Sequence, residues 1–238
     1  MSADFTFTKE NLDRCLSRLA KEFRKSNGTV EIILVGGAAV LANYGFRDMT
    51  YNIDAILQAP SSMKDAINKV GDEMRLPYGW LNSDFVRTSS YSPKLMQYSR
   101  YYKRFGNVLE VRTVSGAYLV AMKLMSGRQY KNDISDVVGI LEEQKACGKP
   151  ISLEMIQTAV QNLYGSWEKL PAESREFIDR VMKAGALEKL YAQYRDMEKA
   201  AKESLIDFEK KYPGAANTNN VNDIIRSLKR SKTVGGDN

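Results

Sequence analysis

The chain has 238 residues and a formal net charge of +6. That length is sufficient for one large domain, or for a domain with a helical extension. The sequence contains no histidine, which excludes Ser-His and Cys-His catalytic pairs, histidine-ligated zinc and imidazole proton transfer. Any chemistry must therefore come from carboxylates, lysines, hydroxyls or a bound metal ion.

Location and redox state are constrained by what the sequence lacks. It has no run of eighteen apolar residues, and its N-terminus lacks the charged-then-apolar layout of a secretory signal. The two cysteines provide no disulfide framework, and Cys15 falls on the apolar face of a helical pattern, where we expect a core residue. We therefore expect a cytoplasmic protein that does not contact a membrane.

The N-terminal third opens with a helix expected over residues 9–25, after Thr8 as its N-cap. A buried strand is expected over residues 30–35. Gly36 and Gly37 then open an Ala- and Leu-rich helix. Because the first N–H groups of a helix have no intrahelical acceptor and lie at its positive end, this turn is a potential anion site.

A second strand is expected over residues 51–57, and it carries Asn52 and Asp54. In a strand, residues two apart point to the same face, so these two side chains are expected to project together. Phosphate and metal could therefore meet beside the glycine pair. A helix is then expected over 63–74 and a strand over 84–88, which carries Asp84. A basic aromatic helix or loop is expected over 95–105, and a strand that carries Glu110 over 107–114.

Basic and aromatic residues are concentrated between residues 87 and 131. This segment has nine basic residues against one acid, Glu110, so its charge is +8 and the rest of the chain sums to −2. Cations attract phosphates and aromatic rings stack on bases, a combination typical of nucleotide- or RNA-binding grooves. A solvated basic face with tyrosines in the core explains the same pattern equally well.

A buried helix is expected over residues 115–128, opened by Ser115, with Lys123 as its one charge among apolar neighbours. Burying a lysine is costly unless it is paired or bound to an anion. Asp133 and Asp136 follow on one helix face, where either could pair with Lys123 or Arg128. The pattern fits a structural salt bridge as well as an anion site.

The sequence becomes highly charged and helical after residue 148. Helices are expected over 153–164, 173–183, 187–211 and 223–232. We therefore divide the chain into a core over 1–148, a helical region over 149–212, and a linker with a short basic helix and tail over 213–238. The helical region could cap the core, contact tRNA or contact a partner.

The glycine pair and the strand after it resemble the signature of the nucleotidyltransferase fold of the DNA polymerase beta superfamily, in which Gly-Gly or Gly-Ser at a strand-to-helix turn precedes D-x-D. The spacing is similar to that of bacterial members related to AbiEii-type toxins, with the pattern GGxAxxxxGxRxTxDID. The matching residues are Gly36, Gly37, Ala39, Gly45, Arg47, Thr50, Ile53 and Asp54. Asn52 departs from the pattern, because it stands where the family has its first Asp.

The resemblance implies an α/β (α+β) fold with a mixed sheet and flanking helices. It also implies Mg²⁺-dependent transfer of a nucleoside monophosphate from an NTP to a hydroxyl of RNA, such as tRNA, or of protein. The chain would be the toxin of a pair with a cognate antitoxin.

The resemblance also assigns residues to roles. The implied metal ligands are Asn52, Asp54 and a third carboxylate, for which we prefer Asp84 to Glu110. The implied nucleotide-binding residues are Gly36, Gly37, Arg47 and Thr50, together with Lys123, Arg128, Asp133 and Asp136, which match a lysine followed by R-D-x-x-D in related toxins. For Arg47, the alternative is a surface ion pair with Asp48.

Asn52 lowers the expected activity. An amide ligates Mg²⁺ poorly and cannot accept a proton. Changing a residue that only supports a metal ligand lowers metal affinity or activity by roughly 10- to 100-fold. Replacing a ligand carboxylate by an amide should lower activity by at least as much. Two interpretations stay open. The chain is either an enzyme impaired at Asn52, naturally or deliberately, or a non-catalytic nucleotide-, RNA- or partner-binding protein with a degenerate fold. We favour the enzyme.

Overall fold

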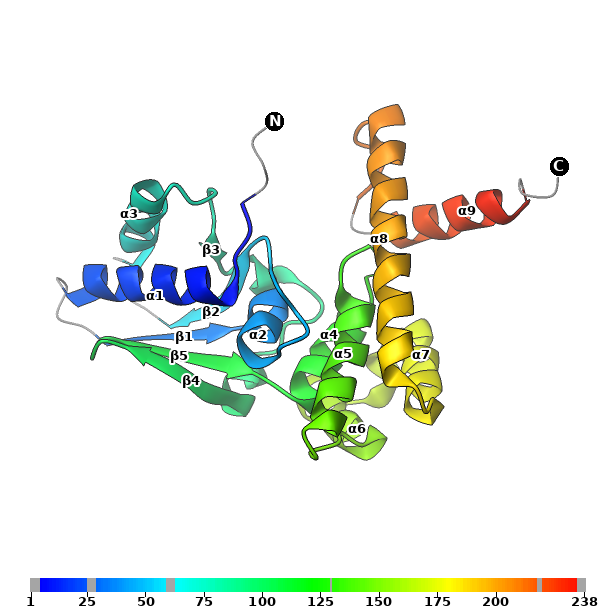
Figure 1. Cartoon of the computed structure of the whole chain (residues 1–238), viewed down its shortest axis with the longest axis horizontal. Coiled ribbons are helices and arrows are strands. Elements are labelled where there is room, and N and C mark those ends of the chain that lie inside the picture. The colour runs from blue at the N-terminus through cyan, green and yellow to red at the C-terminus, as the bar shows by residue number, and fades with distance from the viewer. Residues whose placement is uncertain (1–4, 25–28, 59–62, 129, 218–219, 235–238) are drawn as a thin grey trace.

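A five-stranded mixed sheet lies on one side of the molecule (Figure 1). The computed structural model describes residues 5–24, 29–58, 63–128, 130–217 and 220–234. The strands are β1 (Val30–Leu34), β2 (Ile53–Gln58), β3 (Leu81–Asn82), β4 (Ser99–Phe105) and β5 (Leu109–Val114), in the order β3-β2-β1-β5-β4. The central β1 pairs antiparallel with β2 and parallel with β5, which explains why its sequence is almost continuously apolar.

Three helices accompany the first strands: α1 (Lys9–Phe23), α2 (Gly36–Asn43) and α3 (Met63–Met74). Thr8 caps α1 as expected, in a capping box with Asn11. The predicted apolar face of α1 is buried, including Cys15 with no exposed surface. α2 begins at Gly36 itself, directly after β1, so the glycine pair forms the first turn of the helix.

The expected strand over residues 84–88 is wrong. The strand here is the two-residue β3, and Asp84–Arg87 form a 3₁₀ helix. The Asn82 side chain accepts a hydrogen bond from the backbone N–H of Asp84 at 3.0 Å, which turns the chain away from the sheet. Asp84 therefore lies just after a strand and not within one.

The expected helix or loop over residues 95–105 is also partly wrong. A 3₁₀ helix, Pro93–Tyr98, is followed by β4, which pairs antiparallel with β5. Only Ser99 and Phe105 of β4 are buried, so the strand shows no alternation that a sequence pattern could reveal. β4 is an edge strand, and edge strands commonly carry basic residues because the charges discourage pairing with other chains.

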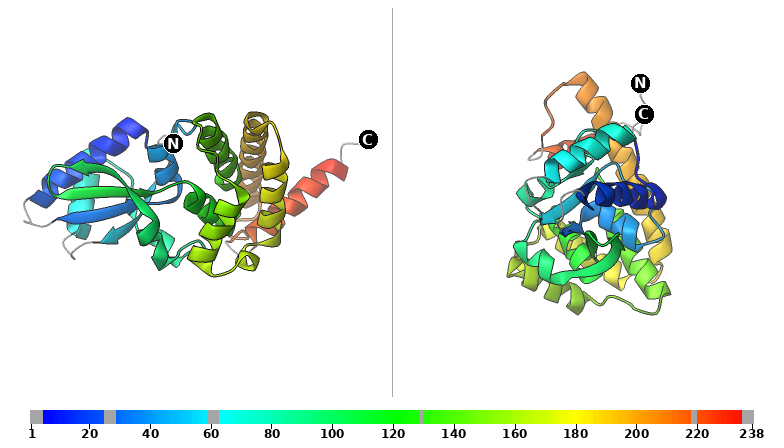
Figure 2. Two further views of the ribbon diagram at one scale, coloured as in Figure 1. Left: turned by 90° about the horizontal axis from the view of Figure 1, so that it is seen from below. Right: turned by 90° about the vertical axis from the view of Figure 1, so that its left-hand side faces the viewer.

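The remaining helices lie beside the sheet (Figure 2). They are α4 (Ala117–Ser126), α5 (Asp133–Ala146), α6 (Leu153–Tyr164), α7 (Ala172–Lys183), α8 (Leu187–Lys211) and α9 (Val221–Val234). α4 follows Gly116, which has φ of +60°, and so starts later than the expected Ser115. Within the described ranges, no helix is both long and apolar enough to cross a membrane.

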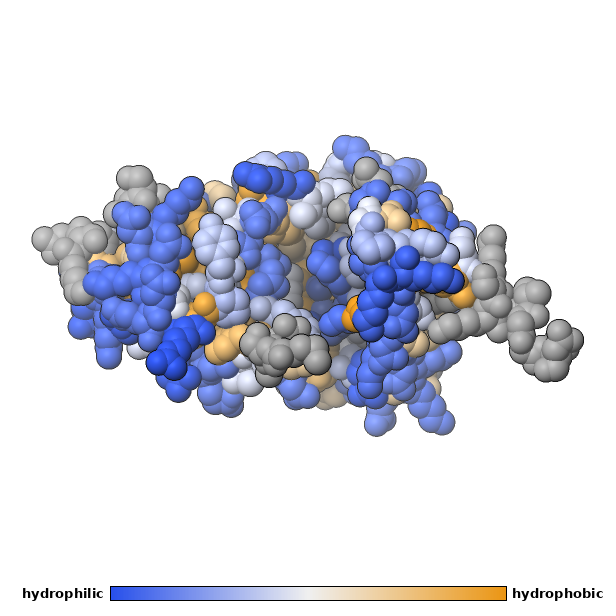
Figure 3. Space-filling model, turned by 90° about the horizontal axis from the view of Figure 1, so that it is seen from above, coloured by the Kyte–Doolittle hydropathy of each residue, from blue (hydrophilic) through white to orange (hydrophobic). Residues whose placement is uncertain are grey.

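The helices connect to the sheet through α4 and α5. α4 contacts α2, α5, α6 and α7, while α5 contacts the long helix α8. One hydrophobic cluster runs from α1 through α7, and a small second cluster joins α8 to α9. Seen from above, the surface is recessed between the sheet and the helical side (Figure 3).

Candidate nucleotide-binding site

The turn between β1 and α2 brings the glycine pair against β2. Gly36 has φ of +55°, and a β-carbon there would lie 3.6 Å from Asp54 Oδ2. A β-carbon at Gly37 would lie 2.7 Å from Thr50 Oγ1, a distance that side chains do not tolerate. Gly36 therefore provides the positive-φ backbone beside Asp54 from which α2 starts, and Gly37 allows the first turn of α2 to pack against Thr50.

A pocket of about 250 Å³ opens at this point. One side of the pocket carries the carboxylates of Asp54 and Asp84 and two amides. The other side carries three cations and the carboxylate of Asp133, and hydroxyl and apolar residues complete the wall. The lining residues are Gly36, Gly37, Asn52, Asp54, Asn82, Asp84, Phe85, Thr88, Ser90, Leu119, Met122, Lys123, Ser126, Arg128, Lys131 and Asp133. Eight of the twelve residues proposed from the sequence therefore meet in one cavity, although they come from segments far apart in the chain.

The side chains of Asn52 and Asp54 do meet, although β2 starts at Ile53, so Asn52 lies in the bend before the strand expected over residues 51–57. The Asn52 amide nitrogen donates a hydrogen bond to Asp54 Oδ1 at 3.0 Å. Burial raises the pKa of Asp54 above its ordinary value, although Lys131, Arg128 and Lys123 act in the opposite direction. On the neighbouring strand, Asn82 lies in register with Asp54. Asn82 could not be singled out from the sequence, because a two-residue strand carries no periodic signal.

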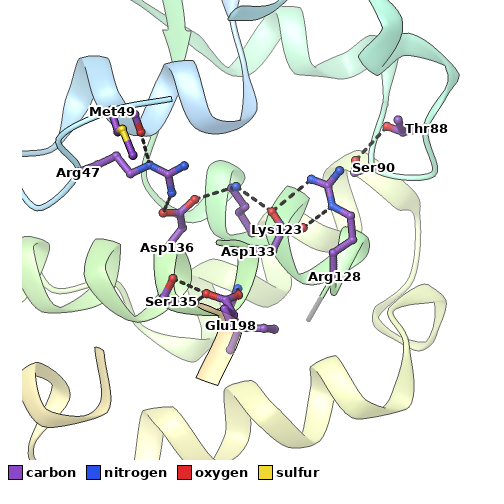
Figure 4. A network of polar contacts seen from close by, with 11 residues as sticks. Arg47, Met49, Thr88, Ser90, Lys123, Arg128, Asp133, Ser135, Asp136 and Glu198 are labelled. Atoms are coloured by element: carbon purple, nitrogen blue, oxygen red, sulfur yellow. Dashed lines mark hydrogen bonds and ion pairs between the residues drawn. The ribbon is translucent and has the colours of Figure 1, made fainter. Parts of the chain in front are cut away.

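Lys123 sits in a buried ion-pair network on the floor of the site (Figure 4). Its ammonium lies 2.8 Å from Asp133 Oδ1 and 2.8 Å from Asp136 Oδ2, the second an ion pair without hydrogen-bond geometry. Arg128 Nε lies 2.7 Å from the other oxygen of Asp133. The expected pairing of the lysine, the arginine and the two aspartates is therefore present.

The pKa shifts of Lys123 and Asp133 both favour the ionised form. Burial alone would lower the pKa of Lys123, but Asp133 and Asp136 outweigh it, so this pKa is raised. Burial alone would raise the pKa of Asp133, yet Lys123 and Arg128 hold it well below its ordinary value. These charges stabilise one another at neutral pH.

Arg47 and Thr50 lie behind the pocket and do not line it. Arg47 Nη1 lies 2.6 Å from Asp136 Oδ1, so the arginine joins the buried network instead of pairing with Asp48. The Thr50 hydroxyl donates to the carbonyl of Asn52 at 3.2 Å. Both residues support the segment that carries Asn52, and Asp136 connects that segment to α5.

The two candidates for the third carboxylate lie in different parts of the structure. Asp84 lines the pocket, whereas Glu110 lines another hollow and lies, through Oε2, 2.6 Å from Arg104 Nη2. Glu110 therefore relieves the charge of the basic edge strand, and Asp84 is the candidate that the fold brings to Asp54.

The metal-binding capacity of the pocket is limited. Among the described residues, no group of three or more acidic or cysteine side chains is arranged to hold a metal ion. The pocket offers the carboxylates of Asp54 and Asp84 with the amides of Asn52 and Asn82. This donor set fits Mg²⁺ that arrives with substrate phosphates, because such ions take only one or two carboxylates from the protein.

Residues 11–168 match a protein-family model described as a nucleotidyltransferase of unknown function, DUF6036. The match covers more than half of the chain. The chain belongs to this nucleotidyltransferase family. No curated protein and no solved structure matches the chain significantly. Every residue that lines the pocket falls inside the DUF6036 match, whereas α7, α8 and α9 lie outside it.

Proposed function

We propose that this DUF6036 protein is a Mg²⁺-dependent nucleotidyltransferase that moves a nucleoside monophosphate from an NTP to a hydroxyl of RNA, such as tRNA, or of protein. One observation carries the proposal. Asp54 lies against the N-terminus of α2 and shares its pocket with Lys123, Arg128 and Lys131.

Each wall of the pocket has a role in this reaction. The first-turn N–H groups of α2 would donate hydrogen bonds to a substrate phosphate, and the cations of the wall would offset its charge. Phe85, Leu119 and Met122 provide apolar surface for the nucleoside. Asp54 and Asp84 would hold Mg²⁺, which when bound neutralises phosphate charge and lowers the proton affinity of the attacking hydroxyl.

The resemblance to AbiEii-type toxins supports a narrower proposal, in which the protein acts in the bacterial cytoplasm and is controlled by an antitoxin protein. An alternative function is non-catalytic binding of nucleotide, RNA or a partner. It is favoured by one observation: the Asn52 amide donates to Asp54 where the family pattern has a second carboxylate.

Replacing Asn52 by aspartate tests the proposal. We expect Asn52→Asp to transfer label from at least one radiolabelled NTP to total RNA or to protein in Mg²⁺, and the unmodified chain to be slower by about 10- to 100-fold or more. The double variant Asn52→Asp/Asp54→Asn is the matched control, and it should not label. Absence of transfer in every combination, together with salt-sensitive RNA binding, would establish the alternative.

A further inference from the structure

The three cations of the pocket differ in their partners. Lys123 is held by Asp133 and Asp136, and Arg128 is held by Asp133. Lys131 also lines the pocket, but in the described part of the chain no carboxylate forms an ion pair with it. An anion that enters the pocket would therefore find two cations already neutralised and one whose charge is still available.

The charge balance of the pocket depends on Lys131 as much as on the two paired cations. Its lining carries three carboxylates, Asp54, Asp84 and Asp133, against the three cations. Without Lys131 the wall would have net negative charge and would repel phosphates. Burial and the neighbouring Arg128 lower the pKa of Lys131, and the opposing effects of Asp133 and Asp54, neither of which forms an ion pair with it, are too weak to offset them.

The position of Lys131 is set by the residue before it. The Tyr130 ring packs against a small cluster of Ala201 and Leu205 from α8 and Val221 and Ile225 from α9. The Lys131 ammonium lies 6.0 Å from the centre of this ring. The helices α8 and α9 therefore anchor the short segment that carries Lys131 into the pocket.

We propose that Lys131 is the cation that binds the phosphates of the substrate, and that Tyr130 positions it by docking on α8 and α9. Lys123 and Arg128 also line the pocket, but because both pair with Asp133, they contribute less to the positive charge that an entering phosphate meets. This inference rests on the proposed function only in taking a phosphate group as the ligand, so binding can be tested separately from transfer.

Calorimetric titration of the full chain with inorganic pyrophosphate in Mg²⁺ tests the role of Lys131. We expect Lys131→Met to weaken binding by about tenfold or more, the value of a hydrogen bond to a charged group. Lys131→Arg should keep most of the affinity. The matched control is Lys145→Met, which removes the same charge from an exposed position in the last turn of α5 and should leave affinity unchanged.

The role of Tyr130 is tested in the same titration. Tyr130→Ala should weaken pyrophosphate binding, whereas Tyr130→Phe should not, since the ring alone fills the cluster. In the Lys131→Met background, Tyr130→Ala should have no further effect, because a positioning residue acts only through the residue it positions. Circular dichroism on each variant confirms that the fold is retained.

Two outcomes would overturn the inference. If Lys131→Met binds pyrophosphate as tightly as the unmodified chain, Lys131 is not the phosphate-binding cation, while the proposed transfer reaction can still stand. If the unmodified chain binds no pyrophosphate, the pocket does not hold phosphates through Lys131, and the labelling experiment then decides separately whether transfer occurs.

Discussion

Lys123 illustrates how a single residue can be buried with its charge. Only 6% of it is exposed, and it sits between two carboxylates of α5. Arg47 and Arg128 complete the network from both sides, so each aspartate contacts two cations. Such a network contributes less to stability than its contacts suggest, because every charge is desolvated, but removing one member leaves the other charges buried with fewer partners.

We therefore expect Lys123→Met to lower the free energy of unfolding by about 3–5 kcal/mol. Methionine fills a similar volume, but Asp136 then has only Arg47 as a cationic partner, and Asp133 has only Arg128. Urea unfolding monitored by circular dichroism measures the loss. The double variant Lys123→Met/Asp133→Asn should be less stable still, because Arg128 then loses its carboxylate partner. A loss below about 1 kcal/mol for the single variant would contradict this account of the network.

At the scale of elements, α5 holds the loop that leads into β2. Glu143 of α5 accepts hydrogen bonds from the backbone N–H groups of Gly45 at 2.8 Å and Phe46 at 3.2 Å. The Phe46 ring lies against the backbone of α5, where a β-carbon at Gly139 would be only 2.7 Å from it. Tyr191 of α8 packs on the other side of the ring. The absence of a side chain at Gly139 therefore allows the close contact with Phe46 that positions this loop.

Gly139→Ala tests this contact. Alanine is the better helix former by about 1 kcal/mol, but its methyl group would overlap a ring that is held by Tyr44 and Tyr191. Overpacking of this kind typically costs about 1–3 kcal/mol, so we expect a net loss in thermal unfolding experiments. Gly185→Ala is the control, since nothing lies within 4 Å of a β-carbon there. An increase in stability for Gly139→Ala would show that the loop moves freely.

At the scale of the molecule, Glu198 joins the C-terminal helix α8 to the site. Its carboxylate accepts hydrogen bonds from the backbone N–H groups of Ile134 at 2.8 Å and Ser135 at 3.2 Å, which caps the N-terminus of α5 from another helix. Only 5% of Glu198 is exposed. Burial raises its pKa to about 8, despite these hydrogen bonds, and the nearby Asp136 adds to the effect.

This pKa predicts how stability changes with pH. In the unfolded chain Glu198 titrates near its ordinary pKa of 4.5, so between that value and about 8 the folded state binds the extra proton. The stabilisation is complete below pH 4.5 and is lost as the pH rises through about 8. Measured at pH 5.5 and 8.5, the free energy of unfolding should fall more with pH in the unmodified chain than in Glu198→Gln. Parallel profiles would show that Glu198 is ionised throughout.

Several features of the fold and the site could be predicted from the sequence. The helices over 153–164 and 187–211 have the bounds expected from apolar spacing, and the glycine pair meets Asp54 as its motif implies. β4 could not be predicted, because its pairing with β5 and not its own side chains makes it a strand. The partner of Arg47 could not be predicted either, since Asp136 lies 89 residues away.

The sequence by itself therefore determined the helices, the mixed α/β class and the motif that joins Gly36, Gly37 and Asp54, because these depend on spacings within one or two consecutive elements. Only the tertiary structure decided which charges are neutralised and which remain available. The sequence indicated carboxylate partners for Lys123 and Arg128 but could not show that Lys131 has none among the described residues, because that depends on how the segment between α4 and α5 lies in the fold.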